Sequence, residues 1–288
     1  MNELEFLKAL RALPLHDGAC GLEDDCAVLE VGSETLILTH DAMAEGTHFR
    51  SSADPYDVAW KLVATNLSDL AAKGAEPIGI LIGYALGEND ARFIEGLRAV
   101  LSVYDVPLLG GDTISANGPQ SLGLTAIGRA THTPVPIRSG AIVGDAVYVT
   151  GILGRAMLGF DGDPNHAEAF NRPRPLLSEG KALAPHVTAM MDVSDGLLLD
   201  SWRLARASNV TIQLDSEAVP VADPTRREDA IRWGDDYELL FTAPADMRLP
   251  VAATRIGVVG GSNIAPLLLD GEPVSTDDSL GYEHASNS

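Results

Sequence analysis

The sequence predicts an α/β protein (α+β mixed sheets) in which helices cover the sheets. Three observations lead to this class. Short apolar, partly β-branched runs alternate with stretches of helical periodicity, and turn residues add antiparallel strand pairs to this alternation. A chain of 288 residues is also long enough to bury a sizeable core in two medium domains. Strands separated by helices favour an α/β sandwich over a helical bundle or an all-β fold.

The first half of the chain starts with a short helix at 4–10 and continues with a strand pair that delivers Asp41 just past its end. Asp54 and Pro55 predict the N-cap and first residue of a long helix, and Gly74 predicts its end. The other elements expected in this half are strands at 27–29, 35–39, 78–86, 107–109 and 122–128, and a helix from about 90 to 104.

Prolines between Thr131 and Pro136 predict a linker. It divides the chain into an N-terminal α/β domain of residues 1–135 and a C-terminal α/β domain of residues 136–288. The polar, proline-containing stretch from Asp161 to Arg174 predicts a mobile loop. The second domain is expected to contain strands at 147–150, 187–191, 210–214, 238–242 and 254–259, and a helix at 197–207 that Gly196 opens.

Composition excludes several classes of protein. Acids outnumber bases by 41 to 20, and the net charge of -21 argues against binding to nucleic acid or to an anionic membrane surface. No apolar run approaches the length of a membrane span, and the N-terminus is acidic where a signal peptide is basic. A cytoplasmic location is therefore expected. Cys20 and Cys26 show neither a zinc pattern nor a disulfide framework, and we expect buried or partly buried thiols.

Carboxylates recur at the ends of the apolar runs, next to Gly, Ser or Thr residues that let the backbone turn. Gathered in one cleft, such charges repel and raise one another's pKa unless a cation neutralises them. Oxygen ligands suit a hard ion such as Mg²⁺, whose remaining ligands are water and substrate phosphates. For any one acid alone, a helix cap or a turn is the better interpretation. The segments are Asp24-Asp25, Thr39-His40-Asp41, Asn66-Leu67-Ser68-Asp69, Gly110-Gly111-Asp112-Thr113, Asp192-Val193-Ser194-Asp195-Gly196 and Gly234-Asp235-Asp236.

Two alternatives exist for Asp69. It shares a helix face with Asn66, and small residues crowd this part of the helix as if something packs closely against it. Lys73 lies one turn further on, so a solvated salt bridge between Asp69 and Lys73 is the structural alternative to a role in a site.

Two motifs suit phosphate groups. The glycines before Asp112 let the backbone approach a ligand, while the adjacent carboxylate can hold an ion bound to that ligand. The segment from Asp192 to Gly196 places two carboxylates and a hydroxyl at a helix N-terminus. The sequence has neither a Walker A motif nor a kinase glycine loop with its lysine. Phosphate handling would therefore depend on metal ions and backbone amides.

The ordered set of motifs closely resembles the thiamine-monophosphate kinase family, over nearly the whole chain. The resemblance implies the two-domain architecture of the aminoimidazole-ribonucleotide-synthetase-like superfamily, a homodimer formed through the N-terminal domain, and ATP-dependent phosphorylation of thiamine monophosphate to thiamine diphosphate with several Mg²⁺ ions. The motifs are the acidic segments named above, extended to Gly21–Ala27, Glu45–Phe49, Asn66–Ala75 and Gly234–Leu239, together with Arg138–Ala141 and Gly144-Asp145.

The resemblance also implies roles for single residues. Asp112 and Asp195 are expected to be catalytic, and nucleotide contacts are expected from Gly111, Asp112, Arg138 and Ser194. Substrate contacts are expected from His48, Asp235 and Tyr282. The expected metal contacts are Asp25, Thr39, His40, Asp41, Asp69, Asp112, Asp192 and Asp195. The chain departs from the family pattern at His40, where Thr is usual, at Glu23, where Gly is usual, and at Trp233-Gly234-Asp235, where Gly-Gly-Glu is usual.

Alternatives remain open at this stage. His48 could be a packed or capping residue rather than a contact to the acceptor phosphate; a general base is not needed, because a positioned phosphate oxygen is already a nucleophile. Related activities are selenophosphate synthesis, which would call for a reactive Cys in a glycine-rich N-terminal setting that Cys20 lacks, and the ring closure of the purine pathway. A non-catalytic, acidic metal-binding or scaffold protein would explain the acids but not the glycines or Arg138.

Overall fold

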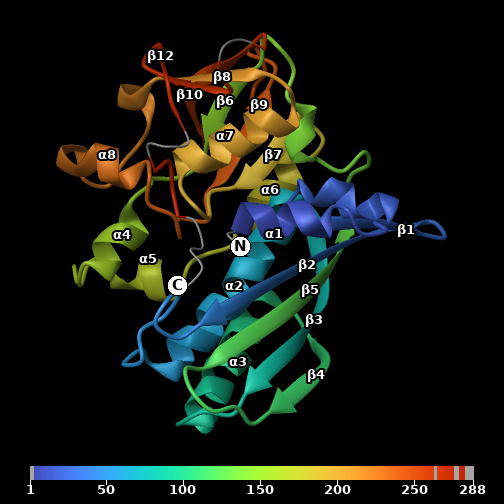
Figure 1. Cartoon of the computed structure of the whole chain (residues 1–288), viewed down its shortest axis with the longest axis vertical. Coiled ribbons are helices and arrows are strands. Elements are labelled where there is room, and N and C mark those ends of the chain that lie inside the picture. Colours follow the sequence, from blue (N-terminus) through green and yellow to red (C-terminus); the bar gives the residue numbers. More distant parts are fainter. Residues whose placement is uncertain (1–2, 263–264, 276–278, 283–288) are drawn as a thin grey trace.

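The computed structural model describes residues 3–262, 265–275 and 279–282. Figure 1 shows two sheets, one in each half of the elongated molecule, with the long helix α2 lying between the N-terminal sheet and the C-terminal half. The prediction of a mixed α/β protein built around two sheets is confirmed. None of the helices in the described part of the chain combines the length and apolar character that a bilayer span needs.

The N-terminal sheet has the strand order β1-β2-β5-β3-β4, and only the β3–β4 pair is parallel. Its strands are β1 (Ala27–Val31), β2 (Glu34–Ala44), β3 (Ala75–Ala85), β4 (Leu108–Ile114) and β5 (Ser121–Ala130). Helices α2 (Pro55–Ala72) and α3 (Asp90–Tyr104) bury one face in a core that includes Ile37, Leu67 and Leu124. On the other face, Leu81 and Ile114 are 38% and 54% exposed.

The C-terminal sheet has the order β12-β11-β8-β10-β6-β9-β7. Its strands are β6 (Ala146–Val149), β7 (Ala189–Asp192), β8 (Thr211–Leu214), β9 (Leu239–Ala243), β10 (Thr254–Gly260), β11 (Leu267–Leu269) and β12 (Glu272–Pro273). Helix α7 (Leu197–Ala207) packs its Leu197, Leu198 and Leu204 into the core of this sheet. The chain passes from one sheet to the other between Ala130 and Ala146.

The remaining elements are short. They are α1 (Glu3–Leu10), α4 (Arg155–Phe160), α5 (Ala167–Asn171), α6 (Leu177–Leu183) and α8 (Arg227–Ala230), with 3₁₀ turns η1 (Asp17–Leu22), η2 (Arg138–Gly140), η3 (Ser216–Ala218) and η4 (Pro224–Arg226).

Helix α2 of the N-terminal half and helix α6 of the C-terminal half pack with their backbones in close contact. A methyl group added to Gly180 would lie 1.9 Å from the carbonyl oxygen of Ala71, and one added to Gly74 would lie 2.4 Å from Cβ of Ala184. Gly74 also has a φ of +59°, which an L-residue rarely adopts, at the end of α2. The glycines at this contact therefore allow the backbones of α2 and α6 to approach each other closely.

Several predicted elements are confirmed. Asp54 caps α2 by accepting a hydrogen bond from the backbone N–H of Tyr56 at 3.0 Å, with Pro55 at the first helical position. Strands β1 and β2 form the predicted antiparallel pair. Both cysteines are free thiols, Cys26 buried and Cys20 partly buried.

Two predictions about strand ends and one about a loop are wrong. Asp41 lies inside β2 rather than past its end, because β5 continues to pair with β2 as far as Ala44. Asp112 likewise lies inside β4, which pairs in parallel with β3 through Ile114. The expected mobile loop at 161–174 contains the helix α5, whose Phe170 packs edge-on against Phe160 of α4.

Candidate active site

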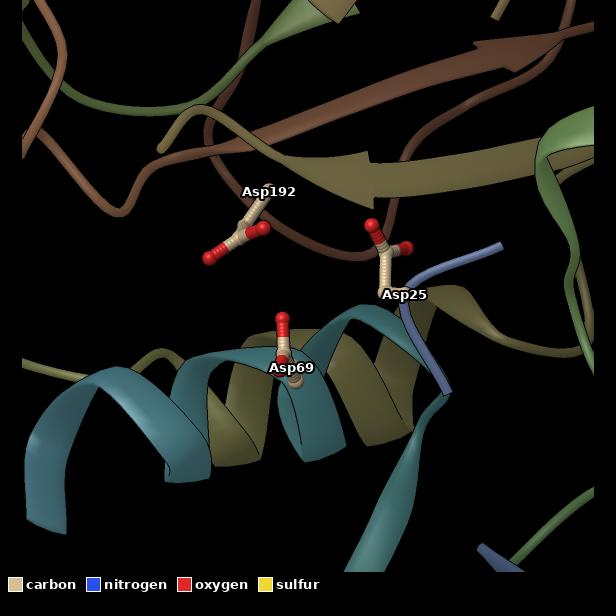
Figure 2. A group of neighbouring side chains, drawn as sticks. All are labelled: Asp25, Asp69 and Asp192. Carbon is tan, nitrogen blue, oxygen red and sulfur yellow. The ribbon is translucent and has the colours of Figure 1, made fainter. Parts of the chain in front are cut away.

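Three carboxylates from separate parts of the chain meet between the two halves. Asp25 precedes β1, Asp69 lies on α2, and Asp192 ends β7. One carboxylate oxygen from each residue lies within 4.8 Å of those from the other two, and Figure 2 shows the three side chains around a common space. Sequence analysis named all three, and the fold brings them together from both halves of the molecule.

Neighbouring side chains hold these carboxylates in place. The Thr39 hydroxyl on β2 donates a short hydrogen bond to Oδ2 of Asp69. The Ser68 hydroxyl on α2 donates to Oδ2 of Asp192 at 2.5 Å, across the boundary between the halves. Oδ1 of Asp192 is buried and has no hydrogen-bond partner among the described residues. A buried oxygen of this kind needs a ligand, because leaving a polar atom unpaired away from water is costly.

The electrostatics of the cluster are uneven. Burial and neighbouring carboxylates raise the pKa of Asp192 to about 8 and the pKa of Asp41 to about 6, and they raise the pKa of Asp69 well above its usual range. Burial alone would also raise the pKa of Asp25, but Arg138 and Lys73 outweigh it and lower this pKa to about 2. Asp41, Asp69 and Asp192 therefore keep their protons to a higher pH than a solvated carboxyl group does, and a bound cation would favour their ionised forms.

Lys73 does not pair with Asp69, so the salt bridge considered as the structural alternative is wrong. Its ammonium lies 2.5 Å from Oδ1 of Asp24 and 2.7 Å from Oδ2 of Asp25. The physical reason is that Lys73 is the C-cap residue of α2, where the chain leaves the helix and the side chain turns toward the segment before β1.

Strand β2 presents Asp41 and His40 to opposite faces of the sheet. The backbone N–H of Asp41 donates to the buried amide of Asn66 on α2 at 3.0 Å, which places Asp41 on the helix side. The His40 ring lies on the opposite face, 2.9 Å from the hydroxyl of Thr125. Only the backbone of His40 is therefore near the cluster.

The loop after β7 is held by Asp200, which sequence analysis did not single out. Its buried carboxylate accepts hydrogen bonds from the backbone N–H groups of Ser194 and Asp195, at 3.1 and 3.0 Å. Arg203 in turn contacts Asp200 at 3.1 Å and Asp195 at 2.5 Å. Asp195 is thus paired with an arginine, apart from the three clustered carboxylates. The sequence signal that could have identified Asp200 is its position as an acid in the first turn of α7, directly after the glycine-containing loop.

Asp235 connects the loop after β7 to a residue that lines a small cavity. Its carboxylate accepts from Lys61 at 2.7 Å and from the Tyr237 hydroxyl at 2.8 Å, and its backbone N–H donates to the carbonyl of Ser194 at 2.8 Å. Lys61 lines a cavity of about 230 Å³, together with His48. Its ammonium also lies 3.9 Å from the ring centre of Phe170.

His48 lines the cavity, whereas Tyr282 contacts the loop after β7. Nδ1 of His48 accepts a hydrogen bond from the backbone N–H of Ala44 at 3.0 Å. The backbone N–H of Tyr282 donates to the carbonyl of Asp195 at 2.9 Å.

Gly111 and Asp112 lie away from this cluster within one chain. The pairing register places Asp41, Leu124, Ile82 and Gly111 in one row across the sheet. Three strand spacings separate Asp41 from β4, which is roughly 14 Å. Asp112 follows in the strand and is exposed on the face opposite α2. Gly111 has a packing reason to be glycine, since a Cβ there would lie 2.0 Å from the carbonyl oxygen of Ile82.

The donor atoms of the cluster fit a hard divalent cation. All are oxygens and they converge from three separate segments of the chain. Asp192 also has a buried oxygen, Oδ1, without a hydrogen-bond partner among the described residues. Asp25, Asp69 and Asp192 are the residues that could hold such an ion, with Asp41 beside them.

Comparison with known proteins assigns the fold to a class. The profile of the AIR synthase related protein family matches in two parts, its N-terminal domain over residues 23–130 and its C-terminal domain over residues 143–254. The chain is thus built from the two domains of this class, with one sheet in each.

Relatives narrow the class to one family. Thiamine-monophosphate kinase of Salmonella typhimurium is 36% identical over 93% of this chain and 92% of its own length. The enzyme of Halobacterium salinarum is 35% identical over 91% and 94%. A solved structure described as AaThiL complexed with AMPPCP and TMP superposes with a TM-score of 0.86 at 29% identity, covering 99% of this chain and 97% of that chain. The chain belongs to the thiamine-monophosphate kinase family.

Proposed function

We propose that this protein transfers the terminal phosphoryl group of ATP to thiamine monophosphate and so forms thiamine diphosphate. The support is the family membership, over nearly the full length of both chains, and a relative of the same fold described with AMPPCP, an ATP analogue, and TMP. The observation that carries the proposal is the meeting of Asp25, Asp69 and Asp192 between the two halves. The cavity at Lys61 and His48 lies about two helical turns from Asp69 along α2.

We infer that the cluster holds Mg²⁺ through Asp25, Asp69 and Asp192, with Asp41 and the hydroxyl of Thr39 next to it. When bound, the ion neutralises phosphate charge and orients the reacting groups. The chain's own part is to fix the carboxylates: Thr39 orients Asp69 and Ser68 orients Asp192. Both carboxylates are thereby held in place before a substrate arrives.

The acceptor end of the site is assigned to the cavity at His48. Lys61 and Asp235 lie between this cavity and the loop after β7, so a substrate with a cationic ring and a phosphate meets both signs of charge there. A phosphate oxygen is nucleophilic without a general base. We therefore propose direct in-line transfer, with His48 as a contact to the acceptor rather than as a base.

The nucleotide contacts of Gly111 and Asp112 require a second chain. Both residues lie on the edge strand β4, on or next to the open face of the N-terminal sheet, where Leu81 and Ile114 are exposed. We propose a homodimer formed by residues 1–135, in which β4 of one copy approaches the cluster of the other and residues 136–288 close the site. Arg138 and Ser194 would complete the nucleotide contacts from the second domain.

The activity is tested with purified protein, ATP, Mg²⁺ and thiamine monophosphate, by following thiamine diphosphate and ADP as products. We expect equimolar formation of both and none in the presence of a chelator. Isothermal titration with AMPPCP, Mg²⁺ and thiamine monophosphate separates the alternatives, because a non-catalytic metal-binding protein would bind Mg²⁺ without thiamine monophosphate. ATP hydrolysis without transfer, or no binding of thiamine monophosphate, would refute the proposal.

The route of transfer has its own test. Direct transfer from ATP that is chiral at its terminal phosphorothioate inverts the configuration at phosphorus. Net retention in the product, or a phosphorylated enzyme that turns over competently, would refute direct transfer.

A further inference from the structure

Lys73 is a cation enclosed within the acidic cluster. Its side chain is 0% exposed. Nζ lies 2.5 Å from Oδ1 of Asp24, 2.7 Å from Oδ2 of Asp25 and 3.3 Å from the carbonyl oxygen of Met190. The contacts to Asp24 and Met190 are hydrogen bonds, whereas the contact to Asp25 is an ion pair in which Oδ2 accepts no hydrogen bond among the described residues. These contacts of Lys73 all lie within the protein.

Lys73 bridges the two halves of the chain through its ammonium. It lies one helical turn beyond Asp69, at the C-cap of α2. Asp24 and Asp25 belong to the segment before β1, while Met190 lies on β7, two residues before Asp192. The ammonium thus contacts the same two halves of the chain that supply the clustered carboxylates.

The carboxylates of the cluster fall into two groups by their partners. Asp25 lies between two cations, since Arg138 contacts its other oxygen. Asp69 and Asp192 instead have hydroxyl partners, from Thr39 and Ser68. Hydroxyl groups donate hydrogen bonds but leave the charge of a carboxylate in place. A divalent ion would therefore be most strongly attracted to Asp69 and Asp192, whose charges have no cationic partner among the described residues.

We propose that Lys73 is a built-in cation that takes the place of a divalent ion between Asp24 and Asp25. It is a positioning residue, which keeps this half of the cluster neutral and folded when no metal is bound. The inference rests on the metal site of the proposed function and narrows its ligands: Asp69 and Asp192 hold the divalent ion with Asp41 beside them, whereas the charge of Asp25 is offset by Lys73 and Arg138. Removal of the ammonium should create one further divalent site.

The test counts bound ions and needs no substrate. Mn²⁺ is titrated into the full-length protein, and the free ion is measured by electron paramagnetic resonance. Lys73→Met removes the charge and keeps a side chain of similar length. Lys181→Met, on α6, removes the same charge outside the cluster. We expect Lys73→Met to bind one more Mn²⁺ than the wild type, and Lys181→Met to bind the same number. The double variant Asp24→Asn, Lys73→Met should also match the wild type, because acid and cation are removed together.

Thermal unfolding gives a second readout. In a chelator, Lys73→Met should melt lower than the wild type by on the order of 10 °C, since a buried ion pair loses one partner. Mn²⁺ should restore most of this loss and should have no such effect on Lys181→Met. An unchanged Mn²⁺ count, or a loss of stability that Mn²⁺ does not reverse, would overturn the inference; a variant that stays unfolded in Mn²⁺ counts as the latter.

The two proposals fail in different ways. If the wild type and Lys73→Met both bind no Mn²⁺, the metal site itself is wrong and the inference falls with it. If the wild type binds Mn²⁺ and Lys73→Met binds no more, only the role given to Lys73 is wrong.

Discussion

The ammonium of Lys61 on α2 lies 2.7 Å from Oδ2 of Asp235, in the segment before β9, and joins the two halves of the molecule beside the cavity at His48. Lys61 is buried, whereas the carboxylate of Asp235 is 29% exposed and also accepts from Tyr237. Burial lowers the pKa of Lys61, and Asp235 opposes this shift. The pair thus fixes a positive and a negative charge at the wall of the proposed acceptor site.

Lys61→Met should weaken the binding of thiamine monophosphate more than the binding of nucleotide. The substitution removes one charge from the cavity wall and frees Asp235 to rotate toward water. The loss of one charged hydrogen bond, about 1.5–3 kcal/mol, predicts a rise of roughly ten- to a hundredfold in KM for thiamine monophosphate. Steady-state kinetics check this, with Lys181→Met as the control for charge. An unchanged KM for thiamine monophosphate would mean that Lys61 only supports the fold.

Asp192→Asn should abolish turnover and stabilise the metal-free protein. The buried carboxylate of Asp192 has a raised pKa, of about 8, because its charge is unfavourable there. The amide oxygen of Asn still accepts from Ser68. In a chelator at pH 8.5 the melting temperature should rise by about 2–4 °C per kcal/mol of relieved repulsion. Asp246→Asn, at an exposed position, is the control. A destabilised Asp192→Asn protein would show that the carboxylate is compensated in the metal-free state.

Stability of the metal-free protein should fall as pH rises from about 5.5 to 8.5. The folded-state pKa values of Asp41, Asp200 and Asp192 are raised to about 6, 7 and 8. The folded state therefore binds more protons than the unfolded state in this range, and the stabilisation is lost as the groups ionise. The pKa of Asp25 is lowered to about 2, so this carboxylate changes the pH dependence of stability only below pH 4. Melting curves in chelator check the slope. Mg²⁺ with nucleotide should raise the melting temperature and flatten the slope, and a slope of opposite sign would refute the argument.

Asp112→Asn should lose activity with an unchanged melting temperature, because Asp112 is exposed on β4. If the partner subunit completes each site, mixed dimers of Asp112→Asn and Asp192→Asn contain one intact site. An equal mixture, unfolded and refolded together, should recover about a quarter of wild-type turnover. No recovery from verified mixed dimers would show that both residues act within one chain. Near-normal turnover of Asp112→Asn alone would remove it from the site.

The sequence was informative where a single segment determines the outcome. Asp54 and Pro55 determine the start of α2, and Gly196 marks the start of α7 at Leu197. Strand ends were less predictable, because β2 and β4 extend as far as their partner strands allow, and that length depends on residues about 80 positions away for Asp41 and about 30 for Asp112.

In the candidate site, too, local features could be predicted from the sequence and long-range contacts could not. The clustered acids could be named from their motifs, since each motif is local. The partners of Lys73 and Lys61 could not, because the contacts span 49 and 174 positions. The alternative of a salt bridge between Lys73 and Asp69 was wrong for this reason: helical spacing suggested Asp69, whereas the folded chain brings Asp24 and Asp25 to the ammonium. Asp200 was missed because an acid near a helix start resembles an ordinary cap.

Gly180 also affects the position of Asp192 relative to Asp69. Ala71, whose carbonyl faces Gly180, lies two residues beyond Asp69, and α6 leads directly into β7 and Asp192. A methyl group at position 180 would push one half of the chain away from the other and carry Asp192 with it. The spacing of the carboxylates therefore depends partly on the absence of a side chain at position 180, a residue that is not itself part of the cluster. A substitution at this surface could impair catalysis while every acid, hydroxyl and ammonium of the cluster stays in place.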